Sequence, residues 1–479
     1  MKLPFIFCLS LVCIATAAED KRPNLLFVIA DDCTFRDIGT YGGQAYTPNM
    51  DRLASEGMKF DACFQTAPMC SPTRHTLYTG LYPVKSGAWA NHTFAHDHVK
   101  SIVHYLRPLG YRVALSGKSH VAPKTVFPFE YSRVSSKKET VTIIDFEAVD
   151  SLLADSAKNQ KPFALFACSN EPHTPWTKGK KFRKRYDAET LKLRPYMVDT
   201  PDTRKAYVDY LAEISFYDQE VGRLLDLLEK HGHAEDTLVM VVSEQGNNFP
   251  FAKWTCYDAG LQSAMLVRWP GRVNPGTTTD AMVEYVDVTP TFVEAAGGTP
   301  AAELDGKSFL EVLEGKTEEH KSHVFGLQTS RGIYSGPDHY GIRSIRDERY
   351  KLILNIDPDA TFSNTINRSS WFKNWQKQAR EGNQHAAWVV GRFANRPALE
   401  FYDLDEDPHE IKNLADDPAQ AERIATMKKK LQAWMDSQGD EGQETEMASY
   451  TRMLSGNNDY KAWIKENGDP NKHKRSKNY

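Results

Sequence analysis

The stretch Asn24-Leu25-Leu26-Phe27-Val28-Ile29-Ala30-Asp31-Asp32 indicates the architecture of this 479-residue chain. Residues 25–30 are all apolar, and two carboxylates follow them directly. A short apolar run bounded by polar residues is typical of a strand buried on both faces of a parallel sheet. Because ligands bind at the carboxyl ends of such strands, Asp31 and Asp32 mark that edge as a candidate site.

Three more runs have the same character, at 113–116, 163–168 and 238–242. Helical patterns lie between them. The clearest spans 205–230, where apolar residues recur at helical spacing on one face and Gly232 follows the end. Alternating strands and helices predict an α/β domain with a large, mostly parallel sheet covered by helices.

Polar residues capable of chemistry follow each of the four strands. They are Asp31 and Asp32, then Lys118 and His120, then His173, and finally Glu244 and Gln245. Placement on one sheet edge predicts an active site there. Two adjacent acids repel each other unless a cation joins them, and oxygen ligands favour a hard divalent ion, Ca²⁺ or Mg²⁺. Glu244 and Gln245 add oxygen ligands, whereas no His/Cys cluster argues for zinc.

A second, smaller region of α+β type is predicted from Arg343 onward. Its expected strands lie at 344–346, 350–355 and 399–404, and its charged helix lies at 418–437 with Asp417 as the N-cap. After residue 439 the sequence turns polar and then basic, which predicts a solvated extension. The expected division is a catalytic domain over 19–342, a C-terminal subdomain over 343–440 and an extension over 441–479.

Charge and the N-terminus bear on partners and location. The 59 basic and 63 acidic residues give a net charge of −4, which provides no field for nucleic acid or an anionic membrane. Lys2, the apolar run 3–14 and the small residues that follow predict a signal peptide over 1–18, with a retained anchor as the alternative. No other segment is long and apolar enough to span a bilayer. We therefore expect a periplasmic or secreted protein.

Five cysteines remain after the predicted signal peptide, which contains Cys8 and Cys13. They are Cys33, Cys63, Cys70, Cys168 and Cys256. They are scattered without a C-x-x-C pair, so neither a zinc site nor a disulfide framework is indicated. Modification of one cysteine would explain the odd number and leave four that are either paired or free.

Cys70 begins the motif Cys70-Ser71-Pro72-Thr73-Arg74, and Leu77-Tyr78-Thr79-Gly80 follows it. The pattern C-x-P-x-R with L-x-T-G resembles the maturation signature of type I sulfatases, in which this cysteine is oxidised to formylglycine (3-oxoalanine). The ordinary alternative is a small buried cysteine before a helix. Pro72 suits the first turn of a helix over 71–79, which places residue 70 at the positive end where an anion is stabilised.

The resemblance to this family extends along the chain. Matching segments occur in the family's order at 23–32, 47–54, 117–120, 172–175, 253–255, 268–271, 401–404, 407–408 and 413–414. The family has an alkaline-phosphatase-like fold, and many secreted members desulfate polysaccharides. One departure is Ser243-Glu244-Gln245-Gly246, where the family usually has S-D-H-G or S-D-N-G. We expect the cation to remain there, with altered geometry or metal preference.

The resemblance implies a role for each motif residue. The metal ligands for Ca²⁺, or alternatively Mg²⁺, are Asp31, Asp32, the modified Cys70, Glu244 and Gln245. The sulfate-binding residues are Arg74, Lys118 and Lys253. His120 assists the formylglycine, and His173 protonates the leaving group and contacts the substrate. The implied partner is a formylglycine-generating or anaerobic sulfatase-maturating enzyme.

These features predict an exported sulfatase that releases inorganic sulfate from esters of a sulfated polysaccharide or its oligosaccharides. Trp89, Asn91 and His92, which follow the nucleophile helix, are the expected substrate contacts. The aromatic segment 371–388 either stacks on sugar rings or forms buried core. Two rival functions stay open: a phosphonate monoester or phosphodiester hydrolase of the same superfamily, and a non-catalytic relative that binds sulfated glycans.

Overall fold

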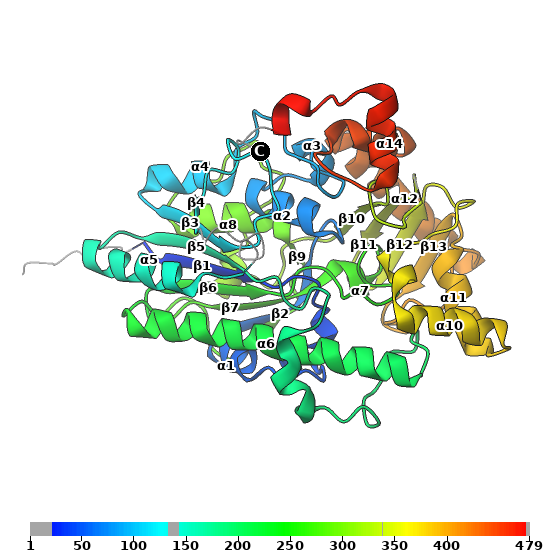
Figure 1. The fold of residues 1–479 in the computed structure, drawn as a ribbon. Helices are drawn as coiled ribbons and strands as arrows, with labels where there is room; N and C mark the ends of the chain where they lie inside the picture. The colour runs from blue at the N-terminus through cyan, green and yellow to red at the C-terminus, as the bar shows by residue number, and fades with distance from the viewer. Residues whose placement is uncertain (1–21, 133–142, 338, 476–479) are drawn as a thin grey trace, which may run out of the picture.

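The computed structural model describes residues 22–132, 143–337 and 339–475, so the predicted signal peptide lies outside the described residues. A nine-stranded sheet runs through the larger part of the molecule in the order β4-β3-β5-β1-β6-β7-β2-β8, with β9 also paired to β2 (Figure 1). Its four central parallel strands are β3 (Arg112–Gly117), β5 (Phe163–Cys168), β1 (Asn24–Ile29) and β6 (Thr237–Val242). These are the four strands expected from the apolar runs.

The rest of the large sheet makes it mixed. β7 (Gln262–Arg268) is antiparallel to both β6 and β2 (Met58–Phe64). The short strands β4 (Glu130–Tyr131), β8 (Thr277–Thr279) and β9 (Val283–Glu284) pair parallel to their neighbours. The sheet is therefore parallel where the predicted site residues follow the strands.

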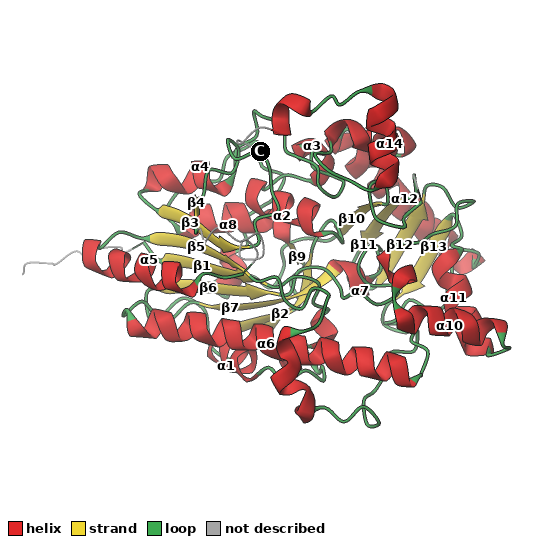
Figure 2. Cartoon of the chain, in the orientation of Figure 1, coloured by secondary structure: helices red, strands yellow, loops and turns green. Residues whose placement is uncertain are grey.

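Helices cover both faces of this sheet (Figure 2). One apolar core packs Leu26 and Val28 of β1 against α1 (Pro48–Glu56), α5 (Phe146–Asn159) and α6 (Pro201–Lys230). A second core packs the alternate residues Phe27 and Ile29 against α2 (Cys70–Thr79), α4 (Ile102–Leu106) and α8 (Val288–Ala295). Successive side chains of a strand point to opposite faces, so β1 contributes to both cores.

The remaining short helices connect these elements. They are η1 (Phe35–Asp37), η2 (Gly39–Tyr41), α3 (Pro83–Ser86), η3 (Arg107–Leu109), η5 (Lys178–Arg185), α7 (Asp258–Leu261), η6 (Tyr285–Asp287) and α9 (Leu310–Leu313). α6 begins at Pro201, ahead of the predicted start, because the Thr200 side chain accepts a hydrogen bond from the Thr203 amide and caps the helix.

A second sheet is antiparallel, in the order β10-β11-β12-β13. Its strands are β10 (Val324–Thr329), β11 (Gly341–Arg346), β12 (Tyr350–Asn355) and β13 (Leu399–Asp403). Helix α12 (Ala421–Gln438) packs its apolar face on this sheet, after the short turn η8 (Pro418–Gln420) that Asp417 caps. β10 was not expected from the sequence, and it places the start of this sheet ahead of the predicted boundary at residue 343.

The aromatic segment 371–388 is mostly core. It forms α10 (Ser370–Arg380) and part of α11 (Gln384–Ala394), preceded by η7 (Thr365–Arg368). Trp371 and Trp375 are buried, and the Trp375 indole donates a hydrogen bond to Thr203 Oγ1 at 2.7 Å. Of the aromatic residues singled out there, Trp388 is the exposed one, so sugar stacking by Trp371 or Trp375 is excluded by their burial.

The C-terminal region is folded up to residue 475, which corrects the prediction of a solvated extension. It forms α13 (Gln443–Ala448), η9 (Ser449–Arg452), α14 (Asn458–Asn467) and η10 (Lys472–Arg475). Tyr450, Met453 and Tyr460 make a small apolar cluster, and Met453 pairs with Thr93 of the catalytic region as an isolated β-bridge. Figure 1 shows this region in red beside α3.

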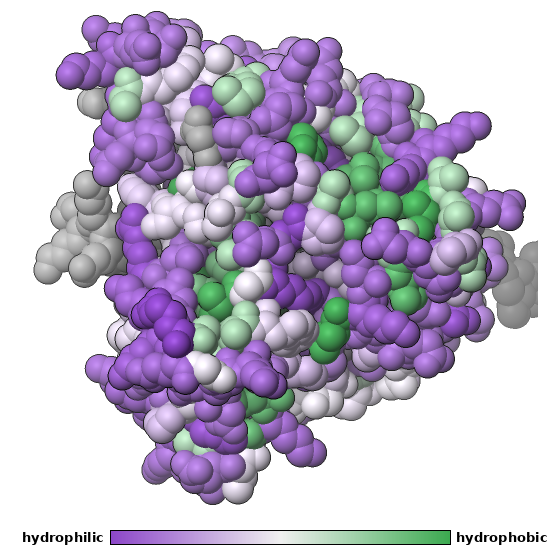
Figure 3. Space-filling model, turned by 90° about the vertical axis from the view of Figure 1, so that its right-hand side faces the viewer, coloured by the Kyte–Doolittle hydropathy of each residue, from purple (hydrophilic) through white to green (hydrophobic). Residues whose placement is uncertain are grey.

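Within the described residues, no helix has the length and apolar character needed to cross a bilayer. Figure 3 shows one face of the molecule as largely hydrophilic, with apolar residues in separate patches.

Candidate active site

Cys70 is the first residue of α2, where the helix presents its free amide groups. Every residue of α2 is buried, and Gly80 ends the helix in the left-handed region at φ 65°. The Cys70 side chain is 3 % exposed. Burial and the neighbouring Asp31 raise the pKa of its thiol to about 12, so an unmodified Cys70 is a poor nucleophile at neutral pH.

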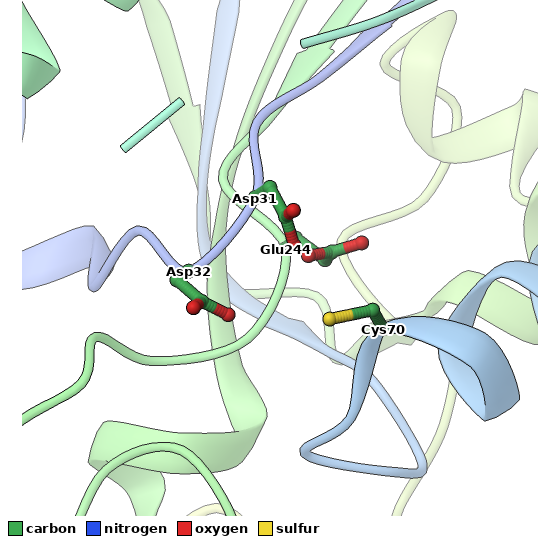
Figure 4. A group of neighbouring side chains, drawn as sticks. All are labelled: Asp31, Asp32, Cys70 and Glu244. Carbon is green, nitrogen blue, oxygen red and sulfur yellow. The ribbon is translucent and has the colours of Figure 1, made fainter. Parts of the chain in front are cut away.

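Three carboxylates face Cys70. Asp31 and Asp32 follow β1, and Glu244 follows β6, as Figure 4 shows. One ligand atom from each of these four residues lies within 4.8 Å of the others, and all four residues are buried. The sheet edge therefore brings together the residues that the sequence analysis assigned to a cation.

Several oxygens in this cluster have no hydrogen-bond partner among the described residues. They are Asp31 Oδ1, Glu244 Oε2 and Gln245 Oε1. The Gln245 amide nitrogen donates to Asp32 Oδ1 at 2.6 Å and to Cys70 Sγ at 3.1 Å. Buried oxygens without partners are costly, and a set of carboxylate and amide oxygens suits a hard divalent cation. The residues present thus fit a metal ion.

Positive side chains surround the carboxylates. Lys253 Nζ lies 2.7 Å from Asp32, and Lys118 forms an ion pair with Asp31. Arg74 Nη2 lies 2.7 Å from Glu244 Oε1, and Arg74 Nη1 donates a hydrogen bond to the Lys118 carbonyl at 2.8 Å. Burial lowers the pKa of Lys118, but Asp31 and Cys70 outweigh it, so the pKa is raised and the ammonium stays charged. Three cations thus converge beside residue 70, where they can bind an anion.

His173 lies on the loop after β5. Its Nδ1 is 2.6 Å from the Thr174 carbonyl oxygen. Because a carbonyl oxygen can only accept a hydrogen bond, Nδ1 carries the proton in the neutral ring. Its Nε2 lies 3.5 Å from Asp32 Oδ2. Burial lowers the pKa of His173, while Asp32 raises it in part. The ring is therefore held with Nε2 toward the cluster.

His120 lies after β3 and contacts His92. Its Nε2 is 3.1 Å from His92 Nδ1, while its Nδ1 is buried and has no hydrogen-bond partner in the described part of the chain. Burial, His92 and Lys118 hold the pKa of His120 well below its usual range. The pKa of His92 falls to about 4 through burial and nearby lysines. Both imidazoles are therefore neutral at pH 7.

Backbone strain is concentrated at this edge of the sheet. Asp32, His92, His120, Glu244 and Trp254 all have positive φ, between 50° and 69°. Non-glycine residues rarely adopt this region, and each such residue costs about 1–3 kcal/mol. Strained residues of this kind gather at functional sites, so their clustering independently marks this edge as one.

The predicted substrate contacts lie in different environments. The Trp89 indole is buried and donates to Ser449 Oγ at 3.0 Å, within the core of the second sheet, a placement that does not favour substrate contact. Asn91 and His92 are half-buried, and Asn91 Oδ1 has no partner among the described residues. Substrate contact by Asn91 and by His92 stays a prediction.

Sequence reasoning missed two residues that hold the His173 loop. Glu171 forms an ion pair with Lys178 across the loop, and its backbone carbonyl accepts a hydrogen bond from the Asp31 amide at 3.0 Å. Glu213 of α6 accepts hydrogen bonds from the Lys178 and Gly179 amides at 3.0 Å and 2.8 Å. The available signal was the acid Glu171 directly before Pro172-His173-Thr174-Pro175.

All five cysteines in the described residues are buried and free. The sequence left open whether the four cysteines other than Cys70 are paired or free, and in the structure they are free thiols. Cys70 differs from the other four because three carboxylates face its sulfur, and together with the sulfur they form a group that could bind a metal ion.

Comparisons with known proteins agree with this geometry. A family model described as Sulfatase matches residues 23–298, and one described as N-sulphoglucosamine sulphohydrolase, C-terminal, matches residues 246–363. An ulvan-active sulfatase of Formosa agariphila is 32% identical over 89% of this chain and 82% of its own length. The human N-sulphoglucosamine sulphohydrolase is 28% identical over 91% of this chain and 94% of its own.

Solved structures with the same fold are more distant in sequence. One is a protein in complex with its substrate D-glucosamine-2-N,6-O-disulfate, with a TM-score of 0.65 and 20% identity over 88% of this chain and 99% of that one. Another is the phosphonate monoester hydrolase of Agrobacterium radiobacter, with a TM-score of 0.68 and 18% identity over 87% and 96%. The expected alkaline-phosphatase-like architecture is confirmed, and it is a fold that more than one reaction uses.

Proposed function

The chain belongs to the sulfatase family and is a sulfuric ester hydrolase, and from this premise we propose that it removes sulfate from a sulfated polysaccharide or its oligosaccharides. The ulvan-active and N-sulphoglucosamine relatives support a carbohydrate substrate. We place the protein in the periplasm or outside the cell, on the strength of the N-terminal sequence at 1–18.

Residue 70 is the proposed nucleophile. Conversion of Cys70 to formylglycine, by a maturating enzyme of the host, replaces a thiol of raised pKa with an aldehyde whose hydrate offers two hydroxyl groups. The position at the start of α2 supports this role because helix amide groups and three cations stabilise the charge that develops on sulfate oxygens. Arg74, Lys118 and Lys253 are the proposed sulfate-binding residues.

His173 is the proposed general acid. Its Nδ1–H is held by the Thr174 carbonyl, so a second proton enters and leaves at Nε2, on the side that faces Asp32. A sugar alkoxide is a poor leaving group and needs this proton as the S–O bond breaks. Asp32 favours the protonated ring, because it raises the His173 pKa against the effect of burial.

His120 is the proposed base for residue 70. Its free Nδ1 can accept the proton of the residue-70 hydroxyl that does not attack sulfur, because a buried neutral imidazole has a lone pair available there. The net reaction adds one water across the S–O bond and yields the sugar alcohol and inorganic sulfate.

The family implies a divalent metal, and Asp31, Asp32, Glu244, Gln245 and residue 70 are the proposed ligands, with Ca²⁺ as the expected ion and Mg²⁺ as the alternative. Such an ion neutralises the carboxylates and draws negative charge away from the reacting oxygen. The unpartnered oxygens of Asp31, Glu244 and Gln245 support this assignment. Glu244 and Gln245 are longer than the usual Asp and Asn or His, and both still provide oxygens here.

The observation that carries the proposal is the convergence of Cys70, three carboxylates and three cations at one buried helix N-terminus. Its test is a parallel assay of the matured enzyme on an aryl sulfate, an aryl phosphodiester and a panel of defined sulfated oligosaccharides. We expect sulfate release from the aryl sulfate and at least one oligosaccharide. Preference for the diester would replace the proposal with the phosphodiesterase reaction, and glycan binding without sulfate release would indicate a non-catalytic protein.

A further inference from the structure

The loop after α3 places His92 against His120, in a strained backbone conformation. The two rings lie 4.9 Å apart between centroids, with His92 Nδ1 at 3.1 Å from His120 Nε2. His92 has φ 61°, a region that an L-residue adopts at a cost and that persists when the surroundings fix it. Between two neutral imidazoles one nitrogen must donate and the other accept.

The C-terminal region holds this loop from outside. The Leu454 amide donates to the His92 carbonyl at 3.1 Å, and Met453 pairs with Thr93 in the adjacent β-bridge. Arg452 donates to the Phe94 carbonyl at 2.7 Å. Met453 itself is fully buried, and its carbonyl accepts a hydrogen bond from Tyr460 at 2.8 Å. These contacts tie the His92 backbone to a segment more than 350 residues later in the chain.

We infer that His92 is a positioning residue for His120, and that residues 452–454 are a structural part of the active site because they fix the backbone from which His92 projects. When His120 Nε2–H donates to His92 Nδ1, the lone pair of His120 lies on Nδ1, the buried nitrogen without a partner among the described residues. This tautomer is the one that can accept a proton from residue 70. The inference rests on the proposed function, in which His120 is the base that accepts the proton of residue 70.

Two substitutions separate the imidazole from the backbone conformation. His92→Gly adopts φ 61° without strain and removes the ring, whereas His92→Asn tolerates this region and places an oxygen near the former Nδ1. We expect His92→Gly to lower kcat on an aryl sulfate by about 10- to 100-fold, less than the full contribution of a general base. KM should fall in parallel, and kcat/KM should change less than about twofold, because the slowed step follows release of the alcohol. His92→Asn should stay within about fivefold of wild type, since it keeps the acceptor.

A further readout distinguishes positioning from a merely structural effect. In the proposed mechanism His120 accepts the residue-70 proton as sulfate is expelled, after the alcohol has left. His92→Gly should therefore show a burst of 4-nitrophenol before a slow steady state, and added imidazole should restore kcat. Equal kcat for wild type and His92→Gly, or equal losses in the Gly and Asn variants without a burst, would overturn the inference. Wild-type turnover in the same assay tests the proposed function separately.

The role of residues 452–454 is tested by removing one backbone N–H. Leu454→Pro cannot donate to the His92 carbonyl, while Leu454→Ala can. Met453 has φ −97° and ψ 147°, a conformation that the residue before a proline prefers, so residue 453 tolerates a proline after it. We expect Leu454→Pro to reproduce the kcat loss and burst of His92→Gly, with Leu454→Ala unchanged. A proline variant with native thermal unfolding and native kcat would refute this part.

An independent observation concerns the charged helix η5, whose sequence Lys178-Gly179-Lys180-Lys181-Phe182-Arg183-Lys184-Arg185 has six cations and no acid. Lys178 and Arg183 are paired with Glu171 and Asp209, but Lys180 and Lys184 are exposed and have no carboxylate partner in the described residues. The Arg185 guanidinium lies 3.9 Å from the ring centroid of Tyr46, whose side chain is 42% exposed.

We propose that η5 and Tyr46 bind a sulfated glycan chain beyond the sugar at the reacting centre. η5 begins five residues after His173, so the loop that carries the proposed acid leads directly into it. Unpaired lysines attract sulfate groups, and an exposed aromatic ring beside a cation suits a sugar face. This proposal also rests on the proposed function, because it extends its substrate from a small ester to a polymer.

The test compares Lys180→Glu/Lys184→Glu with a matched charge change at the exposed Lys428 and Lys429 of α12. For a sulfated polysaccharide, we expect KM of the η5 variant to rise about fivefold at low salt, the effect of losing two exposed ion pairs, and less at high salt. kcat/KM on an aryl sulfate should not change, which keeps this result separate from the proposed function. Equal polysaccharide KM in both variants, or tighter binding of single-stranded DNA than of the polysaccharide, would overturn the proposal.

Discussion

At the residue scale, Asp31 and Glu244 lie side by side in the site, and their surroundings shift their pKa values in opposite directions. Burial raises the pKa of Asp31, but Lys118 and His173 outweigh burial and hold it well below its usual range. Burial and Asp31 raise the pKa of Glu244 well above its usual range, although Arg74 acts against them. The protein's own cations therefore stabilise one of these two carboxylates as an anion and not the other. A bound divalent ion removes this conflict.

Glu244→Gln tests that account because the amide has the same shape without the charge. We expect the metal-free variant to unfold within about 2 °C of the metal-free wild type, since Glu244 favours its neutral form in the absence of metal. Added Ca²⁺ should raise the unfolding midpoint of the wild type and leave the variant nearly unchanged. Calorimetry after chelation, with Ca²⁺ and Mg²⁺ in separate titrations, measures both effects. Equal stabilisation of the two proteins would remove Glu244 from the ligand set.

Cys70→Ala should abolish turnover without unfolding the protein. The side chain loses one atom at the start of α2, and the proposed nucleophile cannot form, so we expect a loss of more than about 10³-fold. The matched control is Cys63→Ala, which removes a fully buried thiol on β2 outside the site and should keep kcat. Sulfate release and thermal unfolding are measured for both. Activity retained in Cys70→Ala would exclude the mechanism.

His173→Ala should affect substrates according to their leaving group. A sugar alcohol needs the proton, so we expect kcat/KM to fall about 10²- to 10⁴-fold, whereas an activated aryl sulfate should lose less than about tenfold. The comparison uses one sulfated monosaccharide and 4-nitrophenyl sulfate with the same enzyme preparation. Parallel losses on both substrates would argue that His173 binds sulfate and is not the acid.

Elements differ in how far the sequence predicts them, and the reasons are local. β1, β3, β5 and β6 are buried on both faces, so their apolar runs identify them. β10 was missed because Gly326 interrupts it and Gln328 is polar. A Cβ at Gly326 would lie 2.3 Å from Ser344 Oγ, so a larger residue would have to displace side chains of β11, a close packing that no local sequence pattern reveals.

The same holds for the site residues. Residues at strand ends and in motifs were predicted as a group, and the fold brings Asp31, Asp32, Cys70 and Glu244 together. Trp89 was assigned to substrate by its position in the sequence, but its indole packs in a core built from the second sheet. The contact between His92 and residues 452–454 depends on long-range pairing, for which the sequence gives no periodic signal.

Glu220 of α6 makes stability depend on pH at the element scale. Burial raises its pKa to about 7, although Ser169 donates a hydrogen bond to it at 2.5 Å. The folded state therefore binds the proton more tightly than the unfolded state does. Protonated Glu220 thus contributes about 3 kcal/mol to the free energy of unfolding. The contribution is fully present below pH 4.5 and is lost as the pH rises to about 7.

Glu220→Gln removes this titration and keeps an acceptor for Ser169. We expect the unfolding midpoint of the wild type to fall between pH 5 and pH 8 by about 3 °C more than that of the variant. Glu229→Gln, at an exposed position of the same helix, is the control and should follow the wild type. Identical pH profiles for wild type and Glu220→Gln would contradict the assignment.

At the scale of the whole molecule, buried charges join parts of the chain that are far apart in sequence. Arg343 of β11 is fully buried and contacts Asp440 at 3.0 Å and Glu446 at 3.0 Å. Thr329 of β10 also donates to Glu446. The polar composition after residue 439 predicted a solvated extension. Its buried carboxylates instead accept hydrogen bonds from an arginine about a hundred residues earlier. Composition alone does not reveal such pairing.

Arg343→Met is the substitution that tests whether these ion pairs hold the C-terminal region in place. Methionine fills the volume but leaves two buried carboxylates without a partner, so we expect destabilisation of about 3–5 kcal/mol. Arg349→Met removes the exposed pair with Asp403 and should leave the unfolding midpoint nearly unchanged. Because residues 452–454 belong to the same region, Arg343→Met should also lower kcat at temperatures below its unfolding midpoint. A variant as stable and as active as Arg349→Met would show that the second sheet and the active-site loop do not depend on this triad.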